Sequence, residues 1–300
     1  MDALTFFGIQ RTDDRWRWRM PVVPELCSGM GTLFGGCGLG AAIEVLERAT
    51  DRPLVWATAQ YLSFARPPSV LHLDATEVVR GHQISQARVV GHVDGEEIFT
   101  VNAALGRRQI DFAGSWAIEP GVPEPETSPV RLVQDRHVGT IMDRLDMRLA
   151  NARNMEEFPA EPGDGRSALW VRLPALDVSA AALAIVGDYV PFGIGQALGQ
   201  RAGGQSLDNT LRVASRVPTE WILADVRVHA VADGFGHGLV HLWAEDGTLL
   251  GTASQSTIVR RWRDGPAVEA RDAAASEIAA GAHEGAADGA TIHAKERTPR

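Results

Sequence analysis

The sequence predicts an α+β protein made of two similar units in tandem, each an antiparallel sheet wrapped around one helix. A strand-rich run opens at Pro68 and reaches an Asp-Gly turn at Asp94, and a second run opens at Pro218 and reaches another at Asp246. The proline starts lie 150 residues apart and the turns 152 apart, which indicates a duplication. Each run follows one candidate helix, the order expected of α+β units.

The first unit is expected to span residues 1–106 and to begin with one or two strands over 5–23. Within this segment, Trp16–Met20 alternates tryptophan and arginine at period two, as a strand does. An arginine pair that binds a phosphorylated ligand is the alternative interpretation. The alternation favours a half-buried strand with tryptophan inside and arginine outside.

A glycine-rich segment over residues 29–36 then leads into a helix predicted over about 36–49. The segment lacks the Gly-Lys-Ser/Thr ending of a phosphate loop, so a nucleoside triphosphate site is not supported. Three or four strands are expected over about 54–105, with a hairpin turn at Asp94-Gly95.

Residues 107–165 are rich in proline, glutamate and glycine. This composition is typical of a connector, and we expect one ordered patch within it at about 138–152. Residues 264–300 contain no aromatic side chain and consist largely of alanine, glycine and charged residues. We therefore expect a disordered tail there.

The second unit is expected to span residues 166–263. Its helix is predicted to be capped by Asp177 or Ser179 and to stop near Pro191, with further strands over about 204–262.

The composition excludes several classes of protein. The chain has 300 residues, of which 45% are hydrophobic, enough for a large core and about two domains. Its net charge of −9 argues against a nucleic-acid partner. Cys27 and Cys37 lack metal-ligand spacing and predict a reducing interior. We saw no run of about 18 apolar residues and no secretory signal, so we expect no membrane span and a cytoplasmic location.

Five short motifs follow one another along the chain: Phe34-Gly35-Gly36, Tyr61-Leu62-Ser63-Phe64-Ala65-Arg66-Pro67, Gly187-Asp188-Tyr189, Ser206-Leu207-Asp208-Asn209 and Ala253-Ser254-Gln255-Ser256. In order and spacing they resemble the acyl-CoA thioesterase II family, over about residues 5–262. The resemblance implies a double hot-dog fold with its two sheets joined edge to edge. It also implies an acyl-CoA substrate, no cofactor apart from the coenzyme A of that substrate, and a homodimer or homotetramer.

The resemblance implies that Asp188, Ser206 and Gln255 hold the attacking water. Serine replaces the commoner threonine and keeps the hydroxyl. A carboxylate can accept the proton of the water, and burial on an apolar helix would raise its pKa towards a useful range. A hydroxyl and an amide can fix the direction of the water.

Phe34, Gly35 and Gly36 are the expected substrate-binding residues, because they lie at the start of the first helix. Backbone N–H groups at a helix start can stabilise the oxyanion that forms on the thioester carbonyl.

The comparison of the two copies strengthens this interpretation. Asp188 falls near Ile43 in the first copy, Gln255 near Ala103, and Ser206 near Val55 or Trp56, so polar residues in one copy face apolar residues in the other. The alternative is that all three are ordinary cap, turn and strand residues. Polar residues in an otherwise apolar setting favour the catalytic interpretation.

Other candidates remain weaker. Glu44 lies near a position where some hot-dog enzymes carry a catalytic acid, although a solvated helix face shared with Glu47 and Arg48 is favoured. Asp208 is a second candidate for the polar contact assigned to Ser206, and Asn209 is expected in a turn or at a strand edge. Five histidines are scattered over the expected strands and turns without metal-ligand spacing, so no metal is expected. These five are His82, His92, His229, His237 and His241.

The sequence therefore predicts an enzyme of fatty acid and lipid metabolism that hydrolyses acyl-CoA thioesters. Its acyl specificity cannot be read from these motifs. Two alternatives stay open: a hydratase or dehydratase acting on acyl thioesters, and a non-catalytic acyl-CoA-binding protein. The first normally needs a histidine close to the aspartate, and the second predicts tight binding without turnover.

Overall fold

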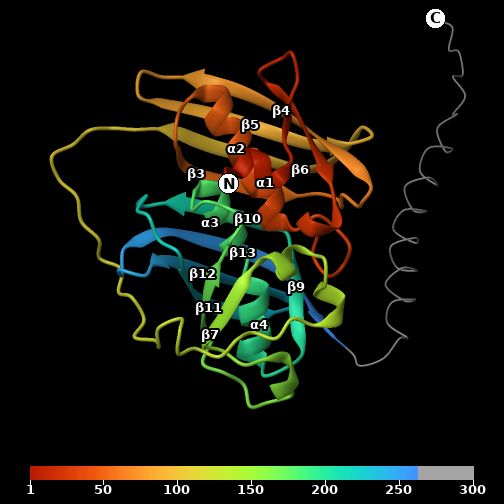
Figure 1. Cartoon of the computed structure of the whole chain (residues 1–300), viewed down its shortest axis with the longest axis vertical. Helices are drawn as coiled ribbons and strands as arrows, with labels where there is room; N and C mark the ends of the chain where they lie inside the picture. Colours follow the sequence, from red (N-terminus) through yellow and green to blue (C-terminus); the bar gives the residue numbers. More distant parts are fainter. Residues whose placement is uncertain (263–300) are drawn as a thin grey trace, which may run out of the picture. The chain divides into compact units, whose positions relative to one another are not determined.

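The computed structural model describes residues 1–262, which form one antiparallel sheet of 13 strands around a pair of central helices (Figure 1). The helices are α1 (Ala3–Phe7), α2 (Gly35–Thr50), α3 (Ala180–Val186) and α4 (Val190–Leu198). The strands of the first half are β1 (Gln10–Arg11), β2 (Arg17–Val22), β3 (Leu54–Tyr61), β4 (Ser69–Arg80), β5 (Ile84–Val93) and β6 (Glu96–Gly106). The remaining strands are β7 (Asp146–Asn151), β8 (Arg166–Arg172), β9 (Ala202–Ser206), β10 (Asp208–Val213), β11 (Ile222–Ala232), β12 (Phe235–Ala244) and β13 (Leu249–Arg261). The tail predicted over 264–300 lies outside the described residues.

The order of the strands is the same when the sheet is read inwards from either edge. It runs β1-β2-β4-β5-β6-β3 from one edge and β7-β8-β11-β12-β13-β10 from the other, with β9 added beside β13. The two halves meet where β3 pairs with β10, and there Thr58 Oγ1 lies 2.7 Å from Thr210 Oγ1. This arrangement is that of two copies of one unit joined edge to edge, and it leaves no open edge at the join.

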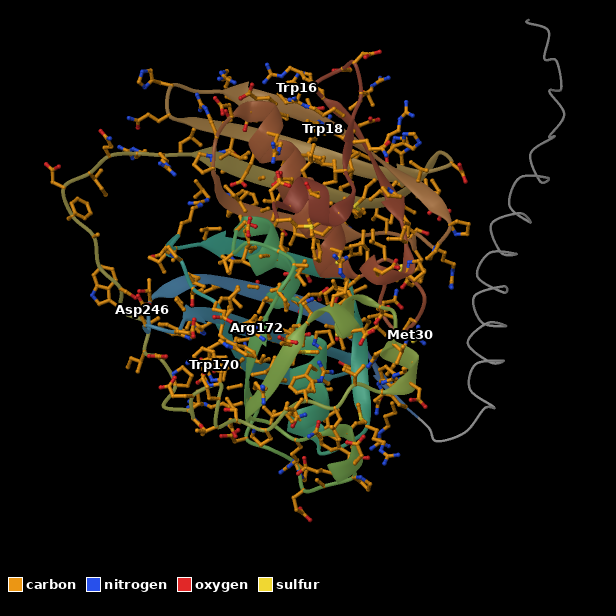
Figure 2. All side chains as sticks on the ribbon, viewed as in Figure 1. Trp16, Trp18, Met30, Trp170, Arg172 and Asp246 are labelled. Atoms are coloured by element: carbon orange, nitrogen blue, oxygen red, sulfur yellow. The ribbon has the colours of Figure 1, made fainter. Side chains whose placement is uncertain are left out.

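The N-terminal segment differs in part from the prediction of one or two strands over 5–23. Residues Ala3–Phe7 form α1, because the Asp2 side chain caps its first turn and Gly8 ends it in the left-handed region, with φ 66°. The predicted alternation holds in β2, where Trp18 is buried and the arginines on either side are exposed. Figure 2 labels Trp16 and Trp18 at this edge of the sheet.

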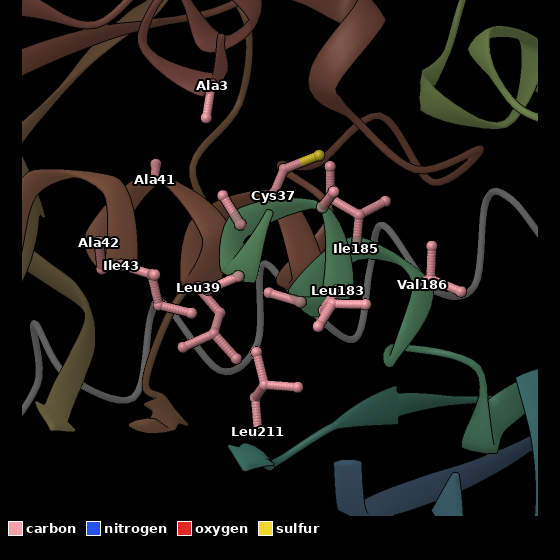
Figure 3. Packing of buried hydrophobic residues seen from close by; sticks show 14 of the residues in the cluster. Ala3, Cys37, Leu39, Ala41, Ala42, Ile43, Leu183, Ile185, Val186 and Leu211 are labelled. Atoms are coloured by element: carbon pink, nitrogen blue, oxygen red, sulfur yellow. The ribbon is translucent and has the colours of Figure 1, made fainter. Parts of the chain in front are cut away.

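Helix α2 forms where the sequence predicts it and packs against α3 with almost no side chain between the two backbones. A Cβ at Gly36 would lie 2.7 Å from the Ala184 carbonyl oxygen, and a Cβ at Gly40 would lie 2.9 Å from that of Ala181. Only glycine permits so close an approach. Fully buried side chains surround this contact (Figure 3), including Leu39, Ile43, Leu183, Ile185, Val186 and Leu211. Burial of each such side chain contributes about 1.5–3 kcal/mol.

The second-half helix is divided in two, so the prediction of one helix that stops near Pro191 is wrong. Helix α3 is capped by Ser179, whose Oγ accepts from the Ala182 N–H at 3.3 Å, and it ends at Gly187. Pro191 lies in the first turn of α4. It can start a helix because the N–H it lacks would have no intrahelical partner there.

The stretch Ala180–Leu198 has the length and composition of a membrane-crossing helix, with a mean hydropathy of 1.3. However, 78% of this apolar window is buried inside the protein. The stretch therefore serves as the core of the fold.

The connector between the halves covers part of the second half. Its predicted ordered patch contains β7, which extends the sheet by pairing with β8. Further upstream, the Pro123 carbonyl oxygen accepts a hydrogen bond of 2.9 Å from Trp170 Nε1, and Val122 packs on a buried tryptophan cluster. The cluster consists of Trp170, Trp221 and Trp243 with Ala168 and Leu223; Figure 2 labels Trp170.

Candidate active site

Asp188 lies in the break between α3 and α4, not within a helix as its surroundings in the sequence suggested. Gly187 brings this break against the sheet, because a Cβ there would lie 2.7 Å from the Ala253 Cβ on β13. Ala253 and Gln255 both lie on β13, two residues apart. The break therefore places Asp188 next to the strand that carries Gln255. Asp188 is only 6% exposed.

The structure brings Asp188, Ser206 and Gln255 together, as the sequence predicts. Asp188 Oδ1 accepts from Ser206 Oγ at 3.3 Å and from Gln255 Nε2. Ser206 is the last residue of β9, which pairs with β13. Three segments that are distant in sequence therefore meet at one carboxylate.

Gln255 has its amide orientation fixed by a second contact. Its Oε1 accepts from the Val190 N–H at 3.1 Å, at the start of α4, while its Nε2 also donates to Ser206 Oγ at 2.9 Å. The carbonyl end of the amide therefore points to the helix and the NH₂ end points to the carboxylate. Gln255 is 2% exposed, so little water competes for these bonds.

The fourth group at this carboxylate comes from the first half of the chain. The Gly36 N–H donates to Asp188 Oδ2 at 2.6 Å. Phe34, the residue before α2, provides no side-chain cap, so Asp188 serves as the cap of this helix. The positive end of the helix also favours the charged form of the carboxylate.

Burial raises the pKa of Asp188 to about 7, while the hydrogen bonds from Gln255, Gly36 and Ser206 act in the opposite direction. Burial prevails because the surrounding helices are apolar and keep water away from the charged form. A carboxyl with this pKa is divided between its two forms near neutral pH. It can therefore accept a proton there and release it again.

Of the residues that the sequence predicted to bind substrate, Gly35 lies next to the carboxylate and Phe34 packs beside Gly36. A Cβ at Gly35 would lie 2.9 Å from Asp188 Oδ2 and 3.0 Å from the hydroxyl oxygen of Tyr61. The absence of a side chain at Gly35 thus leaves room for both oxygens. Phe34 is half-buried, and its ring lies 3.0 Å from the position of a Cβ at Gly36.

Tyr61 and Asn209 are the polar residues of this region that the sequence interpretation did not assign to the site. Asn209 was expected in a turn or at a strand edge, and this was wrong, because it is fully buried within β10. Alternation along the strand gave a signal, since Asn209 and Leu211 are both buried and so share the inner face.

Glu44 and Asp208 do not join the carboxylate cluster. Glu44 is buried and forms an ion pair of 2.6 Å with Arg48, so the expectation of a solvated helix face was wrong for Glu44. Asp208 Oδ1 accepts from the Ser256 N–H at 2.8 Å, which ties β10 to β13. Ile43 and Ala103, the counterparts of Asp188 and Gln255 in the first copy, are both buried in the apolar core.

Comparison with known proteins decides the family. Residues 120–259 match the family described as acyl-CoA thioesterase C-terminal domain. The solved structure of a candidate thioesterase from Novosphingobium aromaticivorans DSM 12444 is 33% identical, with a TM-score of 0.73, over 82% of this chain and 96% of that one. The chain belongs to the acyl-CoA thioesterase family. As a member of this family, the protein is a thioester hydrolase.

Two further solved structures share the fold of this thioesterase. A conserved protein of unknown function with a hot dog fold from Alicyclobacillus acidocaldarius is 20% identical, with a TM-score of 0.74, over 85% of this chain and 96% of that one. An acyl-CoA thioesterase II, TesB2, from Mycobacterium marinum is 17% identical, with a TM-score of 0.67, over 88% and 100%. These similarities confirm the double hot-dog α+β fold. A comparison with curated proteins gave no match.

Proposed function

We propose that this thioesterase cleaves acyl-CoA esters by direct attack of a water molecule that Asp188 deprotonates and that Ser206 and Gln255 orient. The observation that carries the proposal is the buried carboxylate with its pKa near 7 and three hydrogen-bond donors. The cluster combines a base with fixed polar groups, which hydrolysis without a covalent intermediate requires.

In the proposed reaction the water oxygen bonds to the thioester carbonyl carbon as Asp188 takes one proton from the water. The carbonyl electrons move to its oxygen and then return, breaking the carbon–sulfur bond. The coenzyme A thiolate leaves and recovers a proton from Asp188. Thioester and water thus give a carboxylic acid and coenzyme A, and Asp188 returns to its charged form.

The neighbouring thiol supports direct attack by water over a covalent route. Cys37 is fully buried on α2, and burial, reinforced by the charge of Asp188, raises its pKa well above the ordinary value. It therefore stays protonated and is a poor nucleophile.

The hydrogen-bond partners of Asp188 also favour hydrolysis over hydration of an acyl thioester. Among the described residues they are a backbone N–H, a hydroxyl and an amide, and none is a histidine. An aspartate held by these groups can activate water, but it lacks the histidine partner that hydratase chemistry normally needs.

Release of free thiol from short, long, branched and aromatic acyl-CoA esters tests the proposal and identifies the preferred acyl group. Asp188→Asn should lower kcat by a factor on the order of 10²–10⁴ while binding is retained. Asp208→Asn is the matched control, because its oxygen can still accept from the Ser256 N–H. Full turnover by Asp188→Asn would exclude the general-base role. Tight binding without turnover by the wild type would favour an acyl-CoA-binding protein.

A further inference from the structure

Two polar side chains beside the carboxylate cluster are buried without a hydrogen-bond partner among the described residues. The Tyr61 hydroxyl oxygen is one, and the Asn209 side chain leaves both its oxygen and its nitrogen unpaired. An unpaired buried polar group costs about 1–3 kcal/mol. Such groups therefore need an explanation, and a ligand that pairs with them when it binds is one.

Both residues lie on the two strands that join the halves of the sheet. Asn209 pairs with Ala59 in the β3–β10 ladder, and the Tyr61 N–H donates to the Leu207 carbonyl oxygen at 3.0 Å. The Asn209 amide lowers the pKa of the Tyr61 hydroxyl, as a donor that approaches the phenol oxygen does, although the two side chains do not reach hydrogen-bond geometry. The central strands thus hold these polar groups near each other, and the Tyr61 hydroxyl lies beside Gly35 at the start of α2.

The Tyr61 hydroxyl faces the same small space as the carboxylate. The position of a Cβ at Gly35 lies 3.0 Å from the Tyr61 hydroxyl oxygen and 2.9 Å from Asp188 Oδ2. A substrate carbonyl that reaches a water molecule on Asp188 therefore comes close to this hydroxyl. Gly35 carries no side chain that would separate them.

The carbonyl oxygen needs a hydrogen-bond donor as it becomes an oxyanion, and the three donors that hold Asp188 are already occupied by its carboxylate. Of the two backbone N–H groups that the sequence assigned to the oxyanion, that of Gly36 donates to Asp188 Oδ2, which leaves that of Gly35 as the other assigned donor. The Ser206 hydroxyl and the Gln255 amide donate to Asp188 Oδ1. The Tyr61 O–H has no such acceptor.

We propose that the Tyr61 hydroxyl donates a hydrogen bond to the thioester carbonyl oxygen and stabilises the oxyanion during attack by water. The inference rests on the proposed function. No proton leaves Tyr61 in this step: the hydroxyl keeps its proton, Asp188 takes that of the water, and the carbon–sulfur bond breaks as before. Tyr61 is therefore a further catalytic residue.

The protonation state of Tyr61 suits this role. Burial, followed by the charges of Asp188 and Asp208, raises the pKa of the hydroxyl well above its ordinary value. The hydroxyl consequently remains a neutral donor near neutral pH, where Asp188 with its pKa of about 7 can act as a base.

Replacement by Tyr61→Phe removes only the hydroxyl and tests the proposal by steady-state kinetics. We expect kcat to fall on the order of 10²-fold, as it does when one oxyanion donor is lost. Binding of an acyl-CoA thioether, in which CH₂ replaces the carbonyl, should stay within about twofold. Thr58→Val is the control. Thr58 lies on the same strand as Tyr61 but on the opposite face of the sheet, where its hydroxyl bonds to that of Thr210, so the loss of this hydroxyl should leave kcat unchanged. A kcat of Tyr61→Phe within about threefold of the wild type would overturn the Tyr61 role and leave the proposed function intact.

A spectroscopic measurement tests the hydrogen bond between Tyr61 and the substrate carbonyl without any turnover. The chain has two tyrosines, so 3-fluorotyrosine in a Tyr189→Phe background labels Tyr61 alone. Its ¹⁹F resonance should shift when a ketone analogue is added, in which CH₂ replaces the thioester sulfur and the carbonyl is kept. It should shift much less with the thioether that lacks the carbonyl. Equal shifts with both analogues would overturn the hydrogen bond, whether or not the wild type proves to hydrolyse acyl-CoA.

Discussion

Asp188 of the second half caps helix α2 of the first half, because the Gly36 N–H donates to its Oδ2 at 2.6 Å across 152 residues of chain. One hydrogen bond therefore satisfies a helix start and positions the proposed base. The contact joins the second copy, which carries the polar residues, to the first copy, where the buried residues Ile43 and Ala103 stand at the positions of Asp188 and Gln255. The apolar copy thus contributes to the site through its backbone.

The rate of hydrolysis should depend on pH through Asp188. Because burial raises its pKa to about 7, kcat/KM should increase as the pH rises through that value and then level off. Below that pH the carboxyl is protonated and cannot accept a proton from water. Measurement of kcat/KM from pH 5 to 9 checks this. A flat profile across the whole range would exclude a base with this pKa.

Stability should show the opposite trend over the same range. Between the unfolded pKa of about 3.8 and the folded pKa of about 7, the folded state holds a proton that the unfolded chain has released. The free energy of unfolding therefore falls as the pH rises through this window, by up to about 4 kcal/mol from this one group. In urea denaturation from pH 4.5 to 8, the free energy of unfolding of Asp188→Asn should rise relative to that of the wild type as the pH increases. A constant difference between the two proteins would contradict the raised pKa.

Gly35→Ala should damage activity more than folding. The new methyl would lie 2.9 Å from Asp188 Oδ2 and 3.0 Å from the Tyr61 hydroxyl oxygen, so the side chains must move. A displacement of about 1 Å can lower the rate on the order of 10²-fold. Gly121→Ala is the control, since nothing lies within 4 Å of a Cβ there. Wild-type kcat in Gly35→Ala would show that the space above Gly35 is not critical.

Gly36→Ala should instead destabilise the fold. Its methyl would meet backbone atoms of α3, with the Ala184 carbonyl oxygen at 2.7 Å and the Ile185 Cα at 2.8 Å. Backbone cannot rotate away as a side chain can, so we expect a loss of about 1–3 kcal/mol in urea denaturation. An unchanged unfolding midpoint would mean that α2 and α3 can separate without cost.

Gln255→Leu should shift the pH–rate profile to higher pH. Among the groups that lower the pKa of Asp188, the Gln255 amide has the largest effect. Its removal should therefore raise the pKa of Asp188 further. The Val190 N–H also loses its acceptor, which costs about 1–3 kcal/mol of stability. Ser206→Ala, which removes a bond of 3.3 Å, should shift the profile less. The reverse order of the two shifts would contradict the hydrogen-bond network described above.

Local patterns predicted the elements whose causes are local. Helix α2 follows the glycine-rich segment that predicted its start, and β2 follows from its alternation. The short helix α1 was missed because its apolar residues resemble a strand, and only the Asp2 cap and Gly8 distinguish it. Pro191 was interpreted as a helix stop although it lies in the first turn of α4. The break between α3 and α4, which places Asp188 against its partners, was therefore not predicted.

The three predicted polar residues of the site were recognised through a family resemblance, and the residues opposite them were not. Asp188, Ser206 and Gln255 stand in short motifs that keep their order along the chain, and so do Tyr61 and Asn209, to which the resemblance gave no role in the site. Tyr61 and Asn209 meet only because β3 of one half pairs with β10 of the other. That register depends on contacts between distant segments, and no local pattern encodes it.

Under the proposed mechanism, the pairing of Gly36 with Asp188 also sets the number of substrate sites in one chain. A symmetric pair of identical units would form this contact twice, once at each helix start. Here the position that corresponds to Asp188 in the first copy is Ile43, which packs in the core. The proposed mechanism therefore gives one reaction centre per chain, half the number in such a pair, and calorimetric titration with a thioether analogue should reach saturation at one equivalent per chain.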